Sequence, residues 1–214
     1  NPQNVLEQAK RYAAGASDGP GLWNGLRVPF LYATNGEIIW FLDARDAKWV
    51  SRNLGHFHVA DALEELFGRD LDPARKWLLD TPVEKIARLR GYQADCITSM
   101  ESNLMDGKRQ ILVAMATGTG KTFTTVASIY RMLESGLAKR ILFLVDRKAL
   151  AAQAVREFAA FNTPQGNKFI QEYEVYSQRF QKDDFGDDDP FDPKLLPNGY
   201  LTDPKPGHSF VYVS

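Results

Sequence analysis

The stretch ILVAMATGTGKTFTTVASIY, residues 111–130, decides how the second half of this chain is expected to fold. Residues 111–115 form an apolar run with the length of a buried strand, and a turn rich in glycine and threonine follows it. From Lys121 onward, apolar residues recur at helical spacing until Gly136, a residue type that commonly ends a helix. The stretch therefore predicts a buried strand, a tight loop and an amphipathic helix, in that order.

The loop in the middle of this stretch has the composition of a phosphate-binding turn. Gly118 and Gly120 allow the backbone to curl, so that successive N–H groups point inward at phosphate oxygens. The helix that begins there adds the positive end of its dipole. Lys121 supplies a positive charge to the β- and γ-phosphates, and the Thr122 hydroxyl can ligate Mg²⁺, so these two are the predicted catalytic residues. The predicted phosphate-binding residues are Thr117, Gly118, Thr119, Gly120, Lys121 and Thr122.

One position departs from the P-loop pattern G-x-x-x-x-G-K-[ST], because Met115 stands where the first glycine is expected. Helicase-type motors commonly relax this position, whereas P-loop kinases and small GTPases seldom do. The alternative is a turn rich in glycine and threonine that happens to precede a lysine. The predicted strand and helix on either side favour the P-loop.

Composition describes an ordinary globular chain of 214 residues, because charged residues make up 25% of it and hydrophobic residues 44%. The net charge of −1 does not indicate a dedicated nucleic-acid binder, which is usually basic. Cys96 is the single cysteine, which excludes an internal disulfide framework and fits a reducing compartment. No apolar run approaches the roughly 20 residues of a membrane span, and residues 1–10 lack the pattern of a signal peptide. The cytoplasm is therefore the expected location.

The first part of the chain predicts a helix and a hairpin. Asn1-Pro2 is a favourable helix start, and apolar residues follow it at helical spacing. Apolar runs flank Asn35-Gly36, a strong hairpin signal, since both turn positions are expected to need a positive φ. Short helices are expected at residues 61–67 and 73–79. We divide the chain into a first module (1–56), linker helices (57–80) and a second module (81–214).

The second module predicts alternating strands and helices. Helices are expected at residues 92–105, 121–134 and 148–161, and strands at 111–115, 141–145 and 210–213. This alternation indicates an α/β fold with a mainly parallel sheet. Residues 162–209 are expected to be a loop with one short helix or strand. The acidic run at 181–194 lacks the spacing of a calcium loop and indicates a solvated loop.

Two further segments flank the P-loop, and the first is RLRGYQADCI, residues 88–97. It resembles the adenine-reading segment of superfamily 2 helicases and translocases. A glutamine carboxamide can pair with N6 and N7 of adenine, which ATP offers and GTP does not. The resemblance implies that Gln93 reads the adenine of ATP and that Arg90 supports it. The alternative is a solvent-facing glutamine on an ordinary helix.

The second segment is ILFLVDRKALAAQA, residues 141–154, which resembles motif Ia of the same superfamily. There, the end of a strand delivers polar residues to the DNA backbone, as strand ends in open α/β sheets commonly do for ligands. By this resemblance Arg147 is the first candidate for a DNA phosphate contact, with Lys148 second. The alternative is that Asp146 and Arg147 only cap the following helix.

Together, LVAMATGTGKT and LVDRKALAAQA resemble the motor of the restriction (R) subunit of type I restriction–modification enzymes. Subunits of this family carry a PD-(D/E)xK nuclease ahead of a RecA-like motor, and a Q-x-x-x-Y helix closes the nuclease motifs. QAKRY contains Gln8 and Tyr12 on one helix face. The resemblance implies that residues 1–56 are the C-terminal part of the nuclease domain and that residues 81–214 are an incomplete first RecA-like domain.

The resemblance also implies an activity, cofactors and partners. These are ATP- and Mg²⁺-dependent translocation of double-stranded DNA and its endonucleolytic cleavage, in a complex with methylation and specificity subunits and away from membranes. The family places its metal-binding Asp and Glu-x-Lys ahead of the Q-x-x-x-Y helix, and no convincing match precedes Gln8. Asp46-Ala47-Lys48 fits the pattern D-x-K but follows Gln8, so residues 43–48 are expected to be a strand exit and turn. No Walker B acid pair follows Lys121. We therefore expect a piece of a longer subunit that alone neither translocates nor cuts.

Two other functions stay open. One is a superfamily 2 DNA helicase or translocase without nuclease activity, in which QAKRY belongs to an ordinary packed helix. The other is a non-enzymatic, nucleotide-gated binding module whose P-loop acts as a switch.

Overall fold

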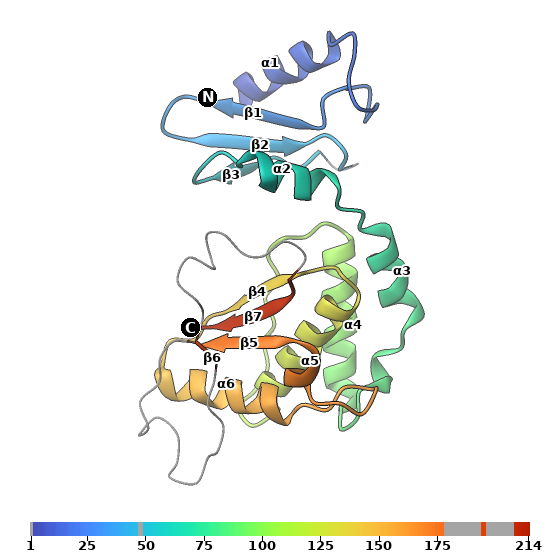
Figure 1. The fold of residues 1–214 in the computed structure, drawn as a ribbon, viewed down its shortest axis with the longest axis vertical. Helices are drawn as coiled ribbons and strands as arrows, with labels where there is room; N and C mark the ends of the chain where they lie inside the picture. Colours follow the sequence, from blue (N-terminus) through green and yellow to red (C-terminus); the bar gives the residue numbers. More distant parts are fainter. Residues whose placement is uncertain (1, 47–48, 178–193, 196–207) are drawn as a thin grey trace. The chain divides into compact units, whose positions relative to one another are not determined.

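A computed structural model describes residues 2–46, 49–177, 194–195 and 208–214 of the chain (Figure 1). The chain divides into two compact units, Asn1–Arg69 and Asp70–Ser214. The boundary falls inside the stretch 57–80, which the sequence suggests as a linker. Among the described residues, no helix is long and apolar enough to cross a membrane.

The first unit contains a helix packed on a three-stranded antiparallel sheet of order β1-β2-β3. Leu6 and Ala13 of the first helix are buried in one cluster with Leu31 and Leu42 of the sheet. This apolar contact explains why the periodic residues of the N-terminal segment form a helix here. The elements are α1 (Pro2–Ala14), β1 (Phe30–Thr34), β2 (Ile39–Asp43), β3 (Arg52–Leu54) and α2 (Ala60–Phe67).

The hairpin between β1 and β2 forms at the predicted Asn35-Gly36 turn, but with a different backbone. Gly36 has a φ of +94°, whereas Asn35 does not have a positive φ. The Asn35 Oδ1 atom instead accepts hydrogen bonds from the backbone N–H groups of Glu37 and Ile38, at 3.1 and 2.9 Å. The expectation that both turn positions need a positive φ is wrong, because the connection is longer than a two-residue turn and a side chain stabilises it.

The expected strand exit and turn at residues 43–48 is confirmed where the structure describes it. Strand β2 ends at Asp43, and the backbone N–H of Asp46 donates to the Asp43 carbonyl oxygen at 3.2 Å. The Asp43 carboxylate forms an ion pair with Arg45 at 2.8 Å. Within the described ranges, no group of three or more His, Cys, Asp or Glu side chains could hold a metal ion.

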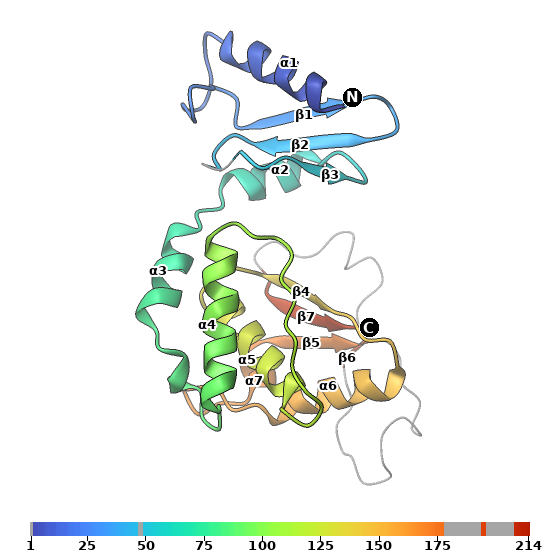
Figure 2. The same ribbon diagram turned by 180° about the vertical axis from the view of Figure 1, so that it is seen from behind.

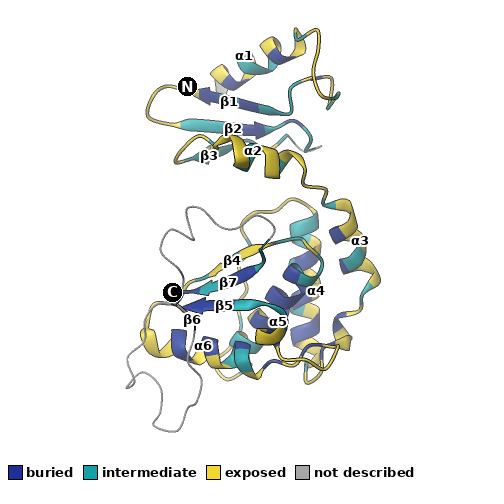
Figure 3. Ribbon diagram, in the orientation of Figure 1, coloured by how far each residue is buried: buried dark blue, intermediate teal, exposed yellow. Residues whose placement is uncertain are grey.

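The second unit has a parallel sheet of order β4-β7-β5-β6 with helices packed against it. Some helices of this unit pack against the strands and others against neighbouring helices (Figure 2), and both helices and strands carry buried residues (Figure 3). The parallel sheet and the α/β class confirm the sequence expectation. The elements are α3 (Asp72–Asp80), a 3₁₀ turn (Val83–Lys85), α4 (Gly91–Met105), α5 (Lys121–Glu134), β4 (Arg140–Phe143), α6 (Lys148–Ala160), α7 (Phe169–Glu172), β5 (Glu174–Ser177), β6 (Lys194–Leu195) and β7 (Phe210–Val213).

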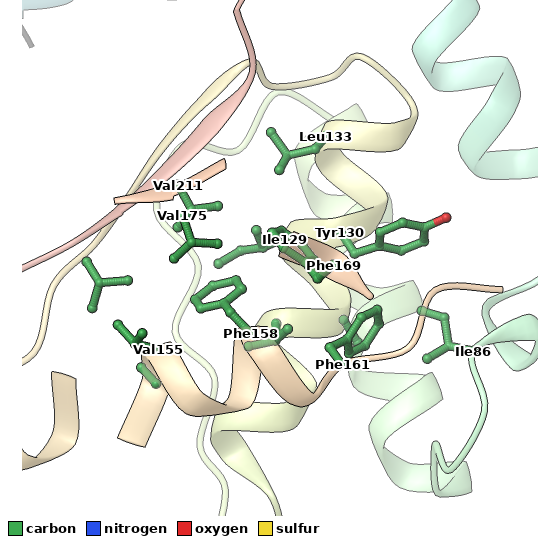
Figure 4. Close-up of a cluster of buried hydrophobic side chains, with 14 of the residues drawn as sticks. Ile86, Ile129, Tyr130, Leu133, Val155, Phe158, Phe161, Phe169, Val175 and Val211 are labelled. Carbon is green, nitrogen blue, oxygen red and sulfur yellow. The ribbon is translucent and has the colours of Figure 1, made fainter. Parts of the chain in front are cut away.

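The core of the second unit lies between α5, α6 and the sheet (Figure 4). Phe158 of α6 and Phe169 of α7 are fully buried, with ring centroids 5.0 Å apart. Val175 of β5 and Val211 of β7 pack in the same cluster. Because α5 contributes a row of fully buried residues to this core, its first turn is held firmly at the edge of the unit.

The predicted strand at residues 111–115 is wrong. The backbone from 111 to 116 has no regular secondary structure, and the Leu112 side chain is 94% exposed. An apolar run becomes a strand only where a neighbouring strand can satisfy its N–H and C=O groups. Strand β4, at one edge of the sheet, pairs with β7 alone among the described strands, so no ladder includes this segment.

The segment 162–209 contains more regular structure than the expected single short helix or strand. It supplies α7, β5 and β6, and β5 lies inside the sheet with Val175 in register with Val211 of β7. The strand is short and surrounded by polar sequence, so only its tertiary pairing reveals it. The acidic run at 181–194 lies outside the described residues, apart from Lys194 in β6.

Candidate nucleotide-binding site

A cavity of about 540 Å³ opens at the N-terminus of α5. Segments far apart in sequence line it: the residues before and at the start of α4, the loop before α5, and one face of α6. This arrangement brings together all the residues that the sequence predicts for ATP binding. The lining residues are Arg88, Arg90, Gln93, Thr117, Gly118, Thr119, Gly120, Lys121, Thr122, Phe123, Leu150, Gln153 and Glu157.

Both glycines of the loop adopt a backbone conformation that suits a phosphate cradle. Gly118 and Gly120 each have a φ of +79°, in the left-handed region that L-residues with a side chain rarely occupy. A Cβ atom on Gly120 would also lie 2.6 Å from Nε2 of Gln93, whereas one on Gly118 would meet nothing within 4 Å. Gly120 therefore satisfies both a backbone and a packing requirement.

The Lys121 ammonium group is folded over the loop. Its Nζ atom donates hydrogen bonds to the carbonyl oxygens of Met115 and Ala116, at 3.2 and 3.0 Å. Thr122 follows in the first turn of α5 and also lines the cavity. Gly120, the N-cap of α5, makes no side-chain capping bond, so no side chain of the cap competes for the N–H groups of the first turn.

Gln93 is buried, with only 3% of its surface exposed, and this excludes the solvent-facing alternative. Its Oε1 atom accepts a hydrogen bond from the backbone N–H of Arg90 at 2.9 Å. Its Nε2 atom donates to the carbonyl oxygen of Thr119 at 3.0 Å. One N–H and one acceptor position of the carboxamide remain for a ligand. The reading of adenine by Gln93 stays a prediction.

Sequence reasoning missed two side chains of the RLRGYQ stretch: Arg88, which lines the cavity, and Tyr92, which contacts the loop from outside the lining. The Tyr92 hydroxyl donates to the Thr119 carbonyl oxygen at 3.0 Å and accepts from the Arg90 guanidinium at 3.0 Å. Arg88 has a φ of +67°, and its guanidinium carbon lies 5.8 Å from the centroid of the Phe123 ring. A non-glycine residue with positive φ beside a cavity is a recurrent mark of functional sites.

The charges around the cavity fit a polyanionic ligand. Arg88, Arg90 and Lys121 contribute positive charge, and Glu157 is the one acidic residue of the lining. The N-terminus of the long helix α5 adds its positive dipole end at the same place. The arrangement can therefore bind a phosphate chain, and the Thr122 hydroxyl is available as an oxygen ligand for Mg²⁺.

The predicted DNA contacts lie at the start of α6. Arg147 is the N-cap residue of α6, and Lys148 is its first residue. The Arg147 side chain makes no capping hydrogen bond and is 79% exposed, with its Nε atom 3.9 Å from the Asp146 carboxylate. Capping by the Arg147 side chain is therefore not observed. The DNA contact stays a prediction.

Gln8 and Tyr12 of the first unit lie together on the outer face of α1. The Gln8 Nε2 atom donates to the Tyr12 hydroxyl oxygen at 2.7 Å, and Tyr12 is 72% exposed. Leu6 and Ala13, not this pair, make the apolar contact with the sheet. The two side chains are therefore available for a role beyond packing, and their part in a nuclease stays a prediction.

Comparisons with known proteins match this chain to restriction enzymes. The family model described as type III restriction enzyme, res subunit, matches residues 86–190. The type I restriction enzyme EcoKI endonuclease subunit of Escherichia coli (strain K12) is 36% identical over 168 residues, which cover 74% of this chain and 14% of that protein. The EcoAI endonuclease subunit of Escherichia coli is 28% identical over 200 residues, with 76% and 23% covered.

A solved fragment of a putative HsdR subunit of a type I restriction enzyme from Vibrio vulnificus YJ016 is 27% identical and covers 68% of this chain and 27% of that one. Its TM-score of 0.29 is too low to support an argument about the fold. The chain spans 14% and 23% of the lengths of the EcoKI and EcoAI subunits. The sequence and family matches together show that this chain is a relative of the endonuclease subunits of type I restriction enzymes.

Proposed function

We propose that this chain forms part of an ATP-driven DNA motor within a type I restriction subunit. The observation that supports this most directly is the cavity at the N-terminus of α5, where the loop 117–122, the start of α4 and α6 converge. Its shape, positive charge and helix N-terminus suit a nucleoside triphosphate.

The residues of the cavity divide the work of holding ATP. Backbone N–H groups of the loop and of the first turn of α5 bind phosphate oxygens, and Lys121 moves from the carbonyl groups of Met115 and Ala116 to the β- and γ-phosphates. Thr122 and the phosphates would hold Mg²⁺, which neutralises charge that develops during phosphoryl transfer. Gln93 reads the adenine edge with its remaining donor and acceptor.

Helix α6 offers a route from the nucleotide to DNA. Leu150, Gln153 and Glu157 of α6 line the cavity, and Arg147 and Lys148 are exposed at its beginning. We propose that Arg147 and Lys148 contact phosphates of the DNA backbone. A change at the γ-phosphate of ATP that shifts α6 would therefore move these two side chains along the DNA. In the whole subunit, we propose translocation of double-stranded DNA and its cleavage, together with methylation and specificity subunits. Gln8 and Tyr12 would serve the nuclease.

ATP hydrolysis by the full-length protein, measured with and without double-stranded DNA, tests this proposal. We expect DNA to stimulate hydrolysis and Lys121→Ala to lower the rate by about 10²- to 10³-fold, as for the loss of other charge-stabilising groups. Lys76→Ala, an exposed lysine of α3 outside the cavity, is the matched control and should keep the wild-type rate.

Hydrolysis that ignores DNA, or that survives Lys121→Ala, would contradict the motor. ATP binding without any hydrolysis would instead support the nucleotide-gated binding module.

A further inference from the structure

We propose that Tyr92 is a positioning residue for the phosphate-binding loop: with Gln93, it fixes the Thr119–Gly120 peptide so that the Gly120 N–H faces the phosphates. The inference rests on the proposed nucleotide site and deepens it. Tyr92 does not itself line the cavity, so it acts on the ligand through its two hydrogen-bond partners, the Thr119 carbonyl oxygen of the loop and the Arg90 guanidinium.

The directions of the hydrogen bonds follow from chemistry. A guanidinium group has donors only, so the Tyr92 hydroxyl oxygen accepts from Arg90 and its own proton is free to go to the Thr119 carbonyl oxygen. The backbone N–H of Arg90 is likewise a donor, which places Oε1 of Gln93 beside it and turns Nε2 toward Thr119. One carbonyl oxygen therefore receives two hydrogen bonds from the start of α4.

Peptide planarity carries this constraint into the cavity. In a trans peptide, the carbonyl group of Thr119 and the N–H group of Gly120 point in opposite directions. The structure contains no cis peptide bond among its described residues. Two donors from the start of α4 hold the carbonyl group, and they consequently direct the Gly120 N–H away from themselves.

Apart from the bonds from α4, the atoms next to this peptide make local contacts: the Thr119 hydroxyl donates to the Ala116 carbonyl oxygen at 2.7 Å, and the Gly120 carbonyl oxygen accepts from the Thr124 N–H at 2.9 Å. Residues 111–116 form no regular secondary structure, and the glycines on both sides of Thr119 have wide conformational freedom. Within the loop, the backbone N–H of Thr119 makes only a long contact of 3.4 Å with the Ala116 carbonyl oxygen. Without the hydroxyl of Tyr92, the peptide would sample more orientations and the cradle would be less preorganised.

The test is the binding of nucleotides to the full-length protein, followed by displacement of a fluorescent ATP analogue. Tyr92→Phe keeps the ring and removes the hydroxyl. We expect it to weaken ATP and GTP by the same factor, about two- to tenfold, as for the loss of one hydrogen bond. The dissociation constant of adenosine, which has no phosphate, should be the same for the wild type and the variant once the affinity of the analogue for each protein is taken into account.

The matched control is Tyr130→Phe, which also loses one tyrosine hydrogen bond, to Gln165, in the same unit but outside the cavity. It should leave all three affinities unchanged. Wild-type affinity for ATP in Tyr92→Phe, or an equal loss for adenosine, would overturn the inference.

The two proposals fail in distinguishable ways. If the wild-type protein binds ATP but shows no DNA-stimulated hydrolysis, the proposed motor function is wrong. The nucleotide affinities of Tyr92→Phe still decide the role of Tyr92 in that case. A wild-type protein that binds no ATP would overturn both.

Discussion

At the scale of single residues, Gly120 shows how tightly the loop 117–122 is specified. Its φ of +79° would cost a residue with a side chain about 1–2 kcal/mol. Its missing Cβ also leaves room for Nε2 of Gln93, which would otherwise lie at 2.6 Å. A methyl group there must push the carboxamide aside and break its bond to the Thr119 carbonyl oxygen.

Gly120→Ala is therefore expected to lower the affinity for ATP by at least about tenfold, from backbone strain and the lost Gln93 contact together. Titration with an ATP analogue measures it. Gly136→Ala is the control, because Gly136 has a φ of +77° at the C-terminal end of α5 and nothing within 4 Å of its Cβ position. It should lose comparable stability and keep its ATP affinity; equal affinities in the two variants would refute the contact argument.

At the scale of elements, the buried side chain of Arg131 joins three helices of the second unit. Arg131 of α5 is 1% exposed, and its Nε atom lies 2.6 Å from Glu101 Oε1 of α4. The Nη2 atom of Arg131 also donates to the Leu78 carbonyl oxygen of α3 at 3.2 Å, and the guanidinium carbon lies 5.2 Å from the Trp77 ring centroid. Because α5 begins at Lys121, this cluster fixes the helix on which the loop is mounted.

Arg131→Met should therefore destabilise the second unit by about 3–5 kcal/mol, because Glu101 would remain buried without its partner. The combined variant Arg131→Met and Glu101→Leu should recover much of that loss. Urea unfolding measures both. Arg75→Met removes the surface pair with Asp72, whose side chains are 45% and 84% exposed, and should change stability by less than about 1 kcal/mol. If Arg131→Met is as stable as Arg75→Met, the buried pair does not have the role that we assign to it.

The elements also show which parts of the fold can be predicted from the sequence. Helices α4, α5 and α6 carry periodic apolar faces, and glycines follow α4 and α5, so local chemistry alone predicts them. The run 111–115 is equally apolar and yet forms no strand, since strand formation depends on a partner that periodicity does not reveal. Strand β5 is the opposite case: weak in sequence, and ordered by pairing with β7.

The same division holds for the site. Lys121 and Gln93 were found because loop chemistry and a short motif are local in sequence. Gln153 and Glu157 reach the cavity only because α6 packs beside α5, and no spacing in the chain indicates that contact. Tyr92 could have been selected from the sequence, because it lies next to Gln93 in the same motif. Its hydrogen bond to the Thr119 carbonyl oxygen could not have been predicted, because the two residues are far apart in the sequence.

At the scale of the whole molecule, a DNA motor must bind DNA of any sequence, and such binding through phosphates weakens as the salt concentration rises. Each phosphate contact releases condensed counterions, so the logarithm of the binding constant falls with the logarithm of salt concentration by about 0.9 per contact. The exposed positions of Arg147 and Lys148 at the start of α6 suit two such contacts.

In the full-length protein, Arg147→Ala and Lys148→Ala should each reduce this salt slope by about one, and they should weaken binding equally on unrelated DNA sequences. Lys168→Ala removes an exposed lysine just beyond the C-terminal end of α6, where its Nζ atom donates to the Ala160 carbonyl oxygen, and should leave the slope unchanged. Binding isotherms at several salt concentrations give the slopes. If the Arg147 and Lys148 variants keep the wild-type slope, α6 does not present its N-terminus to DNA, and the link from nucleotide to DNA must run through another element.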